Sequence, residues 1–380
     1  MKRAVVIISS IIGVMAASWP VVCLAADMAF SGTFMVCGEY RDFRGPIPPG
    51  AAETAAEEEL RLQLEIDGGE DTRGLILLGA SSLDPGAILL REAYLDLRLS
   101  PGAFLRLGKQ KIAWGTGFAW NPTNYLGAEK ARVDPAAEGV DLLNLETDLA
   151  GLTWSLLAKP AGLWDEWGVA GRLGFPLSGG DLSLCAFIQG DRKGAGGDCA
   201  LSLGEWVCHA EFAWKAGSTR AYVVDTAGAY EIRLRPADEF FFHGVLGFYR
   251  QFPGGSFVLI EYYHNDEGWT DLEAAAYYAA DPAIKSDPRL SVDLHGELRR
   301  DYLFGLVRKD GFLHDDLSAG LSLLLNLEDG SFLLAPELSY AWKGDLRLTI
   351  EAGLFCGSAA SEFGSSPVAG TLETAVEVSF

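Results

Sequence analysis

Polar side chains recur at every second position along one short segment of the chain. Residues 90–99 alternate between apolar side chains and a polar series that consists of Glu92, Tyr94, Asp96 and Arg98. This spacing places the whole series on one face of an extended strand. Acids and bases that face each other fix the register between strands, and on the wall of a water-filled channel they sort solutes by charge. Both interpretations apply to this segment.

The polar face continues beyond the turn 100–102. Arg106 and Gln110 fall on one side of a second strand. Leu105 and Leu107 fall on the other side. The two strands together therefore predict one wall of a pore, with a mixed set of acids and bases facing inward.

The same alternation places charged side chains on the polar faces of several later strands. Acids outnumber bases in this set, which consists of Arg172, Glu211, Glu261, Glu337, Arg347 and Glu351. A lumen lined in this way attracts cations and repels anions. We therefore expect a pore lining with a weak preference for cations, although part of the acidity belongs to the loops.

An aromatic segment without charged residues, 114–125, follows the second strand. Its candidate residues are Trp114, Phe118, Trp120, Asn121 and Tyr125. A loop that is surrounded by water has no need of so many rings, because exposed apolar surface is unfavourable. The rings either stack on the apolar faces of sugars or aromatic solutes, or they pack the loop against a wall. Both alternatives place the loop 114–138 inside or against the lumen.

The composition restricts the class of protein. A net charge of −22 argues against nucleic acid and anionic lipid as partners. Hydrophobic residues make up 49% of the chain. Beyond the first 26 residues, however, no run reaches the roughly 18 consecutive apolar residues of a membrane-spanning helix. The apolar residues instead form many short alternating runs, which are typical of a transmembrane β-barrel.

The alternating runs predict an all-β fold, a transmembrane antiparallel up-and-down β-barrel of about 18 strands within residues 27–380. Long and short connections alternate along the chain, as in a barrel with both termini on the periplasmic side. Segments 215–240 and 265–300 are then outer loops, and the second contains a helix that begins at Thr270. An extra hairpin over 220–235 would raise the count to about 20, and the range is about 16–20 strands.

The two ends of the chain indicate export and membrane insertion. Lys2 and Arg3 precede an apolar run and a small-residue cleavage site, which predicts a secretory signal peptide over 1–26. The last ten residues alternate between apolar and polar side chains and end at Phe380. Such a closing strand is typical of bacterial outer-membrane barrels. We expect Phe380 to guide assembly through the barrel-assembly machinery, and outer-membrane lipid and lipopolysaccharide to surround the protein.

Motifs for catalysis or metal binding do not occur in the sequence. It contains no nucleophile-elbow serine, no H-E-x-x-H and no phosphate-binding loop. We therefore expect no enzyme activity, no cofactor and no metal site. A hydrolase with a Ser/His or Asp/His set near one rim, tested at His209, is the least favoured alternative. The five cysteines after residue 26 are odd in number and lack C-x-x-C spacing, which favours free thiols.

Three short motifs follow one another in order: Gly108-Lys109-Gln110, Trp114-Gly115 and Asn121-Pro122. In this order they resemble a pattern of Gram-negative outer-membrane porin-like families. The resemblance implies an outer-membrane channel in which the loop after the fifth strand constricts the pore, and it supplies no substrate. Similar channels for phosphate or acidic polysaccharide line their lumens with bases. This chain departs from that pattern because acids dominate its polar faces. The constriction-loop residues that it implies are Trp114, Phe118, Trp120, Asn121 and Tyr125.

The combined expectation is a porin-like channel through which small hydrophilic solutes diffuse passively, as a monomer or as a homotrimer. The alternative is a structural or adhesive barrel of similar shape, whose lumen is closed by the loops 215–240 and 265–300. Conduction of ions distinguishes the two functions.

Overall fold

The computed structural model describes residues 27–48, 50–83, 87–126, 138–161, 167–218, 220–290 and 297–380. The signal peptide expected over 1–26 lies outside the described residues, as do 127–137, 219 and 291–296 of the expected loops. None of the described helices combines the length and the apolar character that a membrane crossing requires.

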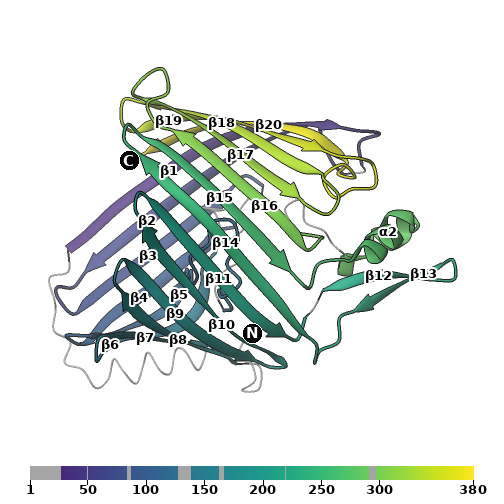
Figure 1. Cartoon of the computed structure of the whole chain (residues 1–380). Helices are drawn as coiled ribbons and strands as arrows, with labels where there is room; N and C mark the ends of the chain where they lie inside the picture. Colours follow the sequence, from purple (N-terminus) through teal and green to yellow (C-terminus); the bar gives the residue numbers. More distant parts are fainter. Residues whose placement is uncertain are drawn as a thin grey trace.

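Eighteen of the described strands form one antiparallel sheet that closes on itself (Figure 1). Each strand pairs with its neighbours along the chain, and β1 also pairs with β20. The predicted up-and-down β-barrel is therefore confirmed, with the predicted number of strands. The barrel strands are β1 (Asp27–Phe43), β2 (Thr54–Asp67), β3 (Thr72–Ser81), β4 (Leu89–Ser100), β5 (Ala103–Gln110), β6 (Val140–Leu149), β7 (Leu152–Lys159), β8 (Gly168–Leu177), β9 (Gly180–Gln189), β10 (Arg192–Leu203), β11 (Trp206–Ala216), β14 (Phe240–Phe252), β15 (Ser256–Asn265), β16 (Asp301–Lys309), β17 (Leu317–Asn326), β18 (Phe332–Trp342), β19 (Leu346–Cys356) and β20 (Val368–Ser379).

The two faces of the barrel strands differ in the way that the alternation predicts. In β20, Leu372 and Val376 point outward and expose 44% and 40% of their surface. Glu373 and Glu377 occupy the alternate positions, so they point into the barrel. An apolar outer face would be unfavourable in water and is favourable against lipid. The closed sheet with this outer face is a transmembrane barrel.

At the seam between the first and last strands, the terminal residue Phe380 pairs with a glycine. The backbone amide of Phe380 donates to Gly32 O at 2.9 Å, and the amide of Gly32 donates to Phe380 O at 2.8 Å. A Cβ atom at Gly32 would lie 2.5 Å from the ring of Phe380. The terminal ring therefore packs over a position where any side chain would clash.

A small module projects from one end of the barrel (Figure 1). It contains the hairpin β12 (Ala221–Thr226) and β13 (Ala229–Leu234), and the helices α2 (Asp271–Ala279), α3 (Pro282–Lys285) and η2 (Pro288–Leu290). The two strands pair only with each other, so the alternative of a 20-stranded barrel is wrong. The predicted capping box is present, because Thr270 Oγ1 accepts from the Glu273 amide and Glu273 Oε2 accepts from the Thr270 amide.

The module has its own apolar core. Val223 and Trp269 are fully buried in it, together with alanines of α2. The indole nitrogen of Trp269 donates to Ala221 O at 2.9 Å and joins the two expected outer loops. We call the end of the barrel that carries this module the loop end. The opposite end, with tight connections such as Gly68–Asp71, is the turn end.

Candidate functional site

The segment Trp114–Leu126 leaves the end of β5 and packs inside the barrel. It contacts the inner faces of β11 and β15 through hydrogen bonds of its backbone. The approach is close at Gly115, which has φ +97° and where a Cβ atom would lie 2.3 Å from Glu211 Oε2. Only glycine meets both conditions without strain. We call Trp114–Leu126 the inward segment.

One carboxylate from β11 holds the middle of the inward segment. Glu211 accepts from the Thr116 amide at 3.0 Å, and from the Thr123 amide and hydroxyl at 2.7 Å each. Gly117 and Asn121 add longer bonds of 3.3 and 3.2 Å. Glu211 exposes only 1% of its surface. A buried carboxylate that accepts several amide bonds fixes the backbone that donates them.

A second carboxylate, from β15, holds the tip of the same segment. Glu261 accepts from the amides of Phe118 and Ala119 at 2.6 and 2.7 Å. Its Oε1 also lies 2.6 Å from His209 Nε2, and both side chains are fully buried. The alternation assigned Glu211 and Glu261 to the pore lining. The structure places both on the inner face but underneath the inward segment, so this assignment is corrected.

The aromatic rings of the inward segment pack against the barrel wall in several places. Trp120 stacks on Tyr263 with ring centroids 4.8 Å apart and an interplanar angle of 15°. Tyr125 stacks on Phe187 at 4.1 Å and 19°. Trp114 is buried, whereas Phe118 exposes 36% of its surface. Packing applies to all four rings, because Phe118 also meets Tyr249 edge-on with ring centroids 5.1 Å apart. Phe118 keeps the largest exposed face of the four.

The predicted wall of acids and bases is present on β4 and β5. Arg106 donates to Asp96 through two bonds of 2.5 and 2.8 Å, and its guanidinium lies 4.0 Å from the ring centre of Tyr94. Glu92 accepts from the Lys111 amide at 3.4 Å. Gln110 is fully buried and donates to a backbone carbonyl, so its assignment to the pore lining is also corrected.

The wall near the turn end borders a cavity of roughly 500 Å³. Both signs of charge line it, and Arg98 and Arg106 are among the bases. Phe104 lies between them in the sequence and also lines the cavity, with 47% of its surface exposed. We call this space the mixed-charge cavity.

Acids dominate another stretch of the sheet, from β18 across the seam to β1. Glu337 lies directly opposite Glu351, Glu351 opposite Glu373, and Glu373 opposite Glu39 across the seam. Arg347 lies opposite Glu377 on the same inner face. We call Glu337, Glu351, Glu373 and Glu39 the acidic wall. Like charges placed opposite each other in a sheet are unfavourable. At the end of this row Arg41 pairs with Glu39 at 2.5 Å.

The sequence analysis named Arg172 and His209 but did not find their contacts or Glu297. Arg172 pairs with Asp198 at 2.7 Å, and Asp198 is almost fully buried. His209 contacts Glu261, and Glu297 accepts from the Trp120 indole at 2.5 Å. Asp198 occupies an inward position of an alternating strand, opposite Glu211, and this position could have identified it. Glu297 lies in a loop where no periodicity applies.

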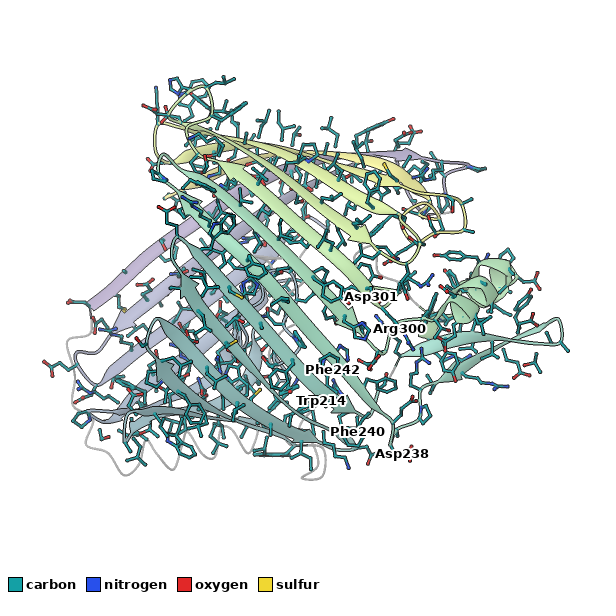
Figure 2. The ribbon with its side chains drawn as sticks, in the orientation of Figure 1. Trp214, Asp238, Phe240, Phe242, Arg300 and Asp301 are labelled. Carbon is teal, nitrogen blue, oxygen red and sulfur yellow. The ribbon has the colours of Figure 1, made fainter. Side chains whose placement is uncertain are left out.

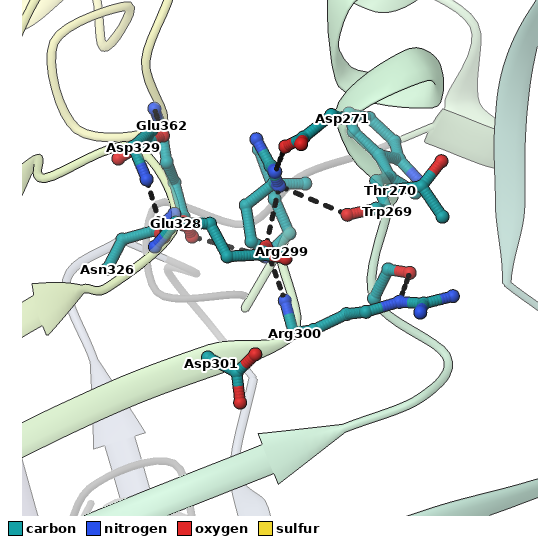
Figure 3. A network of polar contacts seen from close by, with 12 residues as sticks. Trp269, Thr270, Asp271, Arg299, Arg300, Asp301, Asn326, Glu328, Asp329 and Glu362 are labelled. Atoms are coloured by element: carbon teal, nitrogen blue, oxygen red, sulfur yellow. Dashed lines mark hydrogen bonds and ion pairs between the residues drawn. The ribbon is translucent and has the colours of Figure 1, made fainter.

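Long connections are joined by a polar network at the loop end (Figure 3). Arg299 pairs with Asp271, donates to Glu328 at 2.8 Å, and donates to the Trp269 carbonyl. Glu362 accepts from the Leu298 amide, from the Tyr302 hydroxyl at 2.6 Å and from Asn326 at 2.6 Å. Burial raises the pKa of Glu362 to about 7, against the opposing effect of these three donors.

Aromatic side chains gather on the outside of the barrel near the strand ends. Figure 2 shows Trp214, Phe240 and Phe242 on β11 and β14 at the loop end. Trp214 and Phe240 expose 50% and 57% of their surface. Trp342, on β18, exposes 51%. Rings at these positions are typical of the belts where a barrel meets the two membrane interfaces.

Comparison with known proteins shows similarity of structure at low sequence identity. The chain matches no protein-family model and no curated protein. OccAB1 of Acinetobacter baumannii is similar with a TM-score of 0.57 and 12% identity, over 93% of this chain and 96% of that chain. OccK11 (OpdR) of Pseudomonas aeruginosa is similar with a TM-score of 0.55 and 13% identity, over 93% of this chain and 95% of that chain. A mutant of the Rh. blastica porin is similar with a TM-score of 0.51 and 11% identity, over 93% of this chain and 100% of that chain. The chain therefore shares the fold of bacterial porins along nearly its whole length.

Proposed function

We propose that this protein is a channel in the bacterial outer membrane through which small hydrophilic solutes diffuse passively. The observation that carries the proposal is the inward segment, held by Glu211 and Glu261 inside a closed barrel. A segment that serves only as a connection has no need of two buried carboxylates as anchors. Placed across the lumen, it narrows the pore and sets the size of solute that passes.

The location follows from the outer surface and the ends of the chain. The apolar outer face and its aromatic belts suit a bilayer. Residues 1–26 serve as the export signal, and Phe380, at the seam beside Gly32, serves as the assembly signal. Outer-membrane barrels have short periplasmic turns and longer extracellular loops. The turn end then faces the periplasm, and the module with α2 faces the outside.

Selectivity comes from the charges that remain open to the lumen. The acidic wall concentrates cations along one side of the pore. The mixed-charge cavity contributes little net charge. We therefore propose a weak preference for cations. The proposed pore lining consists of Glu92, Tyr94, Asp96, Arg98, Arg106, Arg172, Glu337, Arg347 and Glu351, with Phe118 at the constriction.

Single-channel recording tests the function. The purified, refolded protein is added to a planar bilayer under a KCl gradient, and current is recorded after folding has been verified by circular dichroism. We expect steady conductance and a reversal potential displaced toward that of K⁺. The absence of current from a folded barrel would contradict the channel function. A reversal potential displaced toward that of Cl⁻ would contradict the cation preference.

The polar network at the loop end favours a second candidate, a closed barrel with a structural or adhesive role. Arg299 and Glu362 join three outer connections, and the module adds a folded surface outside the barrel. In this candidate the outer loops close the lumen. The absence of current through a folded barrel is the result that would favour it.

A further inference from the structure

The mixed-charge cavity has unusual chemistry for a chain with so many acids. Three arginines, Arg73, Arg98 and Arg106, line it together with four carboxylates, so its net charge is only −1. A solute with a single charge meets attraction and repulsion there in similar measure. A solute that carries both charges can satisfy both kinds of group.

Only part of this charge is neutralised within the protein. Arg106 forms its two bonds with Asp96. Neither Arg73 nor Arg98 has an ion-pair partner among the residues that the structure describes. Glu146 accepts one bond, from the Asn144 amide group at 3.0 Å, and is exposed. Arg98 and Glu146 therefore retain capacity for a ligand.

A row across three strands arranges these groups. Arg98 on β4 lies opposite Phe104 on β5, and Phe104 lies opposite Glu146 on β6. Neighbouring strands lie about 4.8 Å apart, so the backbones at the ends of the row are roughly 10 Å apart. No ion pair joins the Arg98 and Glu146 side chains among the described residues, so the space between their charged groups is open to a ligand. It can be bridged by a short zwitterion with one hydrogen bond of about 2.8 Å at each end.

The ring between the two charges gives the row an apolar centre. Phe104 exposes 47% of its surface to the cavity, and the Arg98 guanidinium lies 6.0 Å from its ring centre. An aromatic ring on a water-facing wall is costly unless something apolar covers it. A ligand that suits the row therefore has a carboxylate, an ammonium group and an apolar body.

We propose that the mixed-charge cavity is a binding site for zwitterionic solutes with an apolar side chain, such as free amino acids. The carboxylate binds Arg98, the ammonium group binds Glu146, and the side chain covers Phe104. This inference rests on the proposed function, because solutes reach the cavity through the channel. It adds a substrate class that the acidic wall alone would not select.

The test compares three probes that share the phenylalanine side chain and differ in net charge: zwitterionic L-phenylalanine, anionic N-acetyl-L-phenylalanine and cationic L-phenylalanine amide. Binding to the folded protein in detergent is followed by saturation-transfer NMR, and in parallel each probe is added to the turn-end side during single-channel recording. We expect L-phenylalanine to bind more tightly than either singly charged probe, and to cause brief interruptions of current.

Variants identify the site. Arg98→Gln removes a charge-assisted bond and should weaken binding of L-phenylalanine about three- to tenfold. Phe104→Leu and Glu146→Gln should weaken it less. Arg233→Gln is the matched control, because it makes the same change on the exposed strand β13, outside the cavity and outside the proposed pore lining. Binding by the folded control should equal that of the wild type.

The outcomes separate this inference from the channel itself. Equal binding of all three probes, or unchanged binding by folded Arg98→Gln and Phe104→Leu variants, would overturn the site even if the channel conducts. Zwitterion-specific binding without any current would support the site and contradict the proposed function.

Discussion

Two groups of glutamates on the same inner face have opposite surroundings. Glu211 and Glu261 are buried beneath the inward segment, and each accepts bonds from several backbone amides. Glu351 and Glu373, in the acidic wall, are exposed and lie opposite each other. The comparison shows that alternation along a strand determines which face of the sheet a carboxylate occupies. What covers that face decides whether it acts as an anchor or as a charge in the pore.

The largest expected effect comes from removing the anchors. The double variant Glu211→Ala, Glu261→Ala leaves several buried amides of the inward segment without acceptors, and each such amide costs about 1–3 kcal/mol. We expect the segment to leave its position against the wall. Single-channel conductance should then rise and become noisier than that of the wild type.

The matched control makes the same chemical change in the acidic wall. The double variant Glu337→Ala, Glu351→Ala should keep the wild-type noise and a conductance close to the wild-type value, because these positions do not hold the segment. If the anchor variant conducted as the wild type does, or if both double variants opened the pore equally, the distinction between anchors and wall would be wrong.

Trp120 tests whether packing or hydrogen bonding holds the segment. Its ring stacks on Tyr263, its indole donates to Glu297, and only 7% of its surface is exposed. Replacing a buried Trp by Ala costs about 3–5 kcal/mol. We expect Trp120→Ala to lower the temperature at which the folded form disappears in heat-modifiability gels.

Trp120→Phe separates the contribution of the ring from that of the hydrogen bond, because it keeps a ring and removes the indole N–H that donates to Glu297. The free energy of unfolding of this variant should fall by about 1 kcal/mol, the typical contribution of one hydrogen bond. If Trp120→Ala melted at the wild-type temperature, the carboxylates alone would hold the segment. If Trp120→Phe lost as much as Trp120→Ala, the bond to Glu297 would matter more than the ring.

The sequence was sufficient for most of the fold. Period-two alternation and connection lengths predicted the strands, their number and the helix that begins at Thr270, because each rests on local geometry. The hairpin β12–β13 shows the limit. Its alternation resembles that of a barrel strand, and only its pairing partner, which is a tertiary property, separates it from the barrel.

The candidate site was predicted in part for the same reason. Alternation assigned Glu211, Glu261 and Asp96 to the inner face, because side-chain direction is a local property. It could not show that a segment about 90 residues from Glu211 in the sequence covers this side chain, with the Thr116 amide as a donor. Contacts of this kind depend on the packed fold, as does the network around Glu362.

The stability of the loop end should depend on pH through its buried carboxylate, Glu362. Its pKa is about 7 in the folded protein, against an ordinary value near 4.5. The folded form therefore binds more protons between these values, and stability falls as pH rises through 7. One pKa unit corresponds to about 1.4 kcal/mol. Glu362 therefore contributes roughly 3 kcal/mol to the free energy of unfolding in acid, and this contribution is lost above neutral pH.

Hydrogen–deuterium exchange of the outer loops, corrected for intrinsic rates, measures this dependence on both sides of neutral pH. Protection around Leu298 and Asn326 should be greater on the acidic side. Glu362→Gln should flatten the pH dependence, whereas Glu231→Gln, on the exposed hairpin, should leave it unchanged. Greater protection on the alkaline side in the wild type would contradict the assignment.

The smallest expected effect concerns the acidic wall. Glu351→Gln and Glu373→Gln each remove one of two opposing charges. Because like charges across strands are unfavourable by roughly 0.2–1 kcal/mol, these variants should be slightly more stable than the wild type. They should also move the reversal potential under a KCl gradient a few millivolts away from K⁺, whereas Arg347→Gln should move it toward K⁺. A stabilised barrel with unchanged selectivity would mean that the wall is screened from the conducting path, and the cation preference would then have to come from charges at the outer loops.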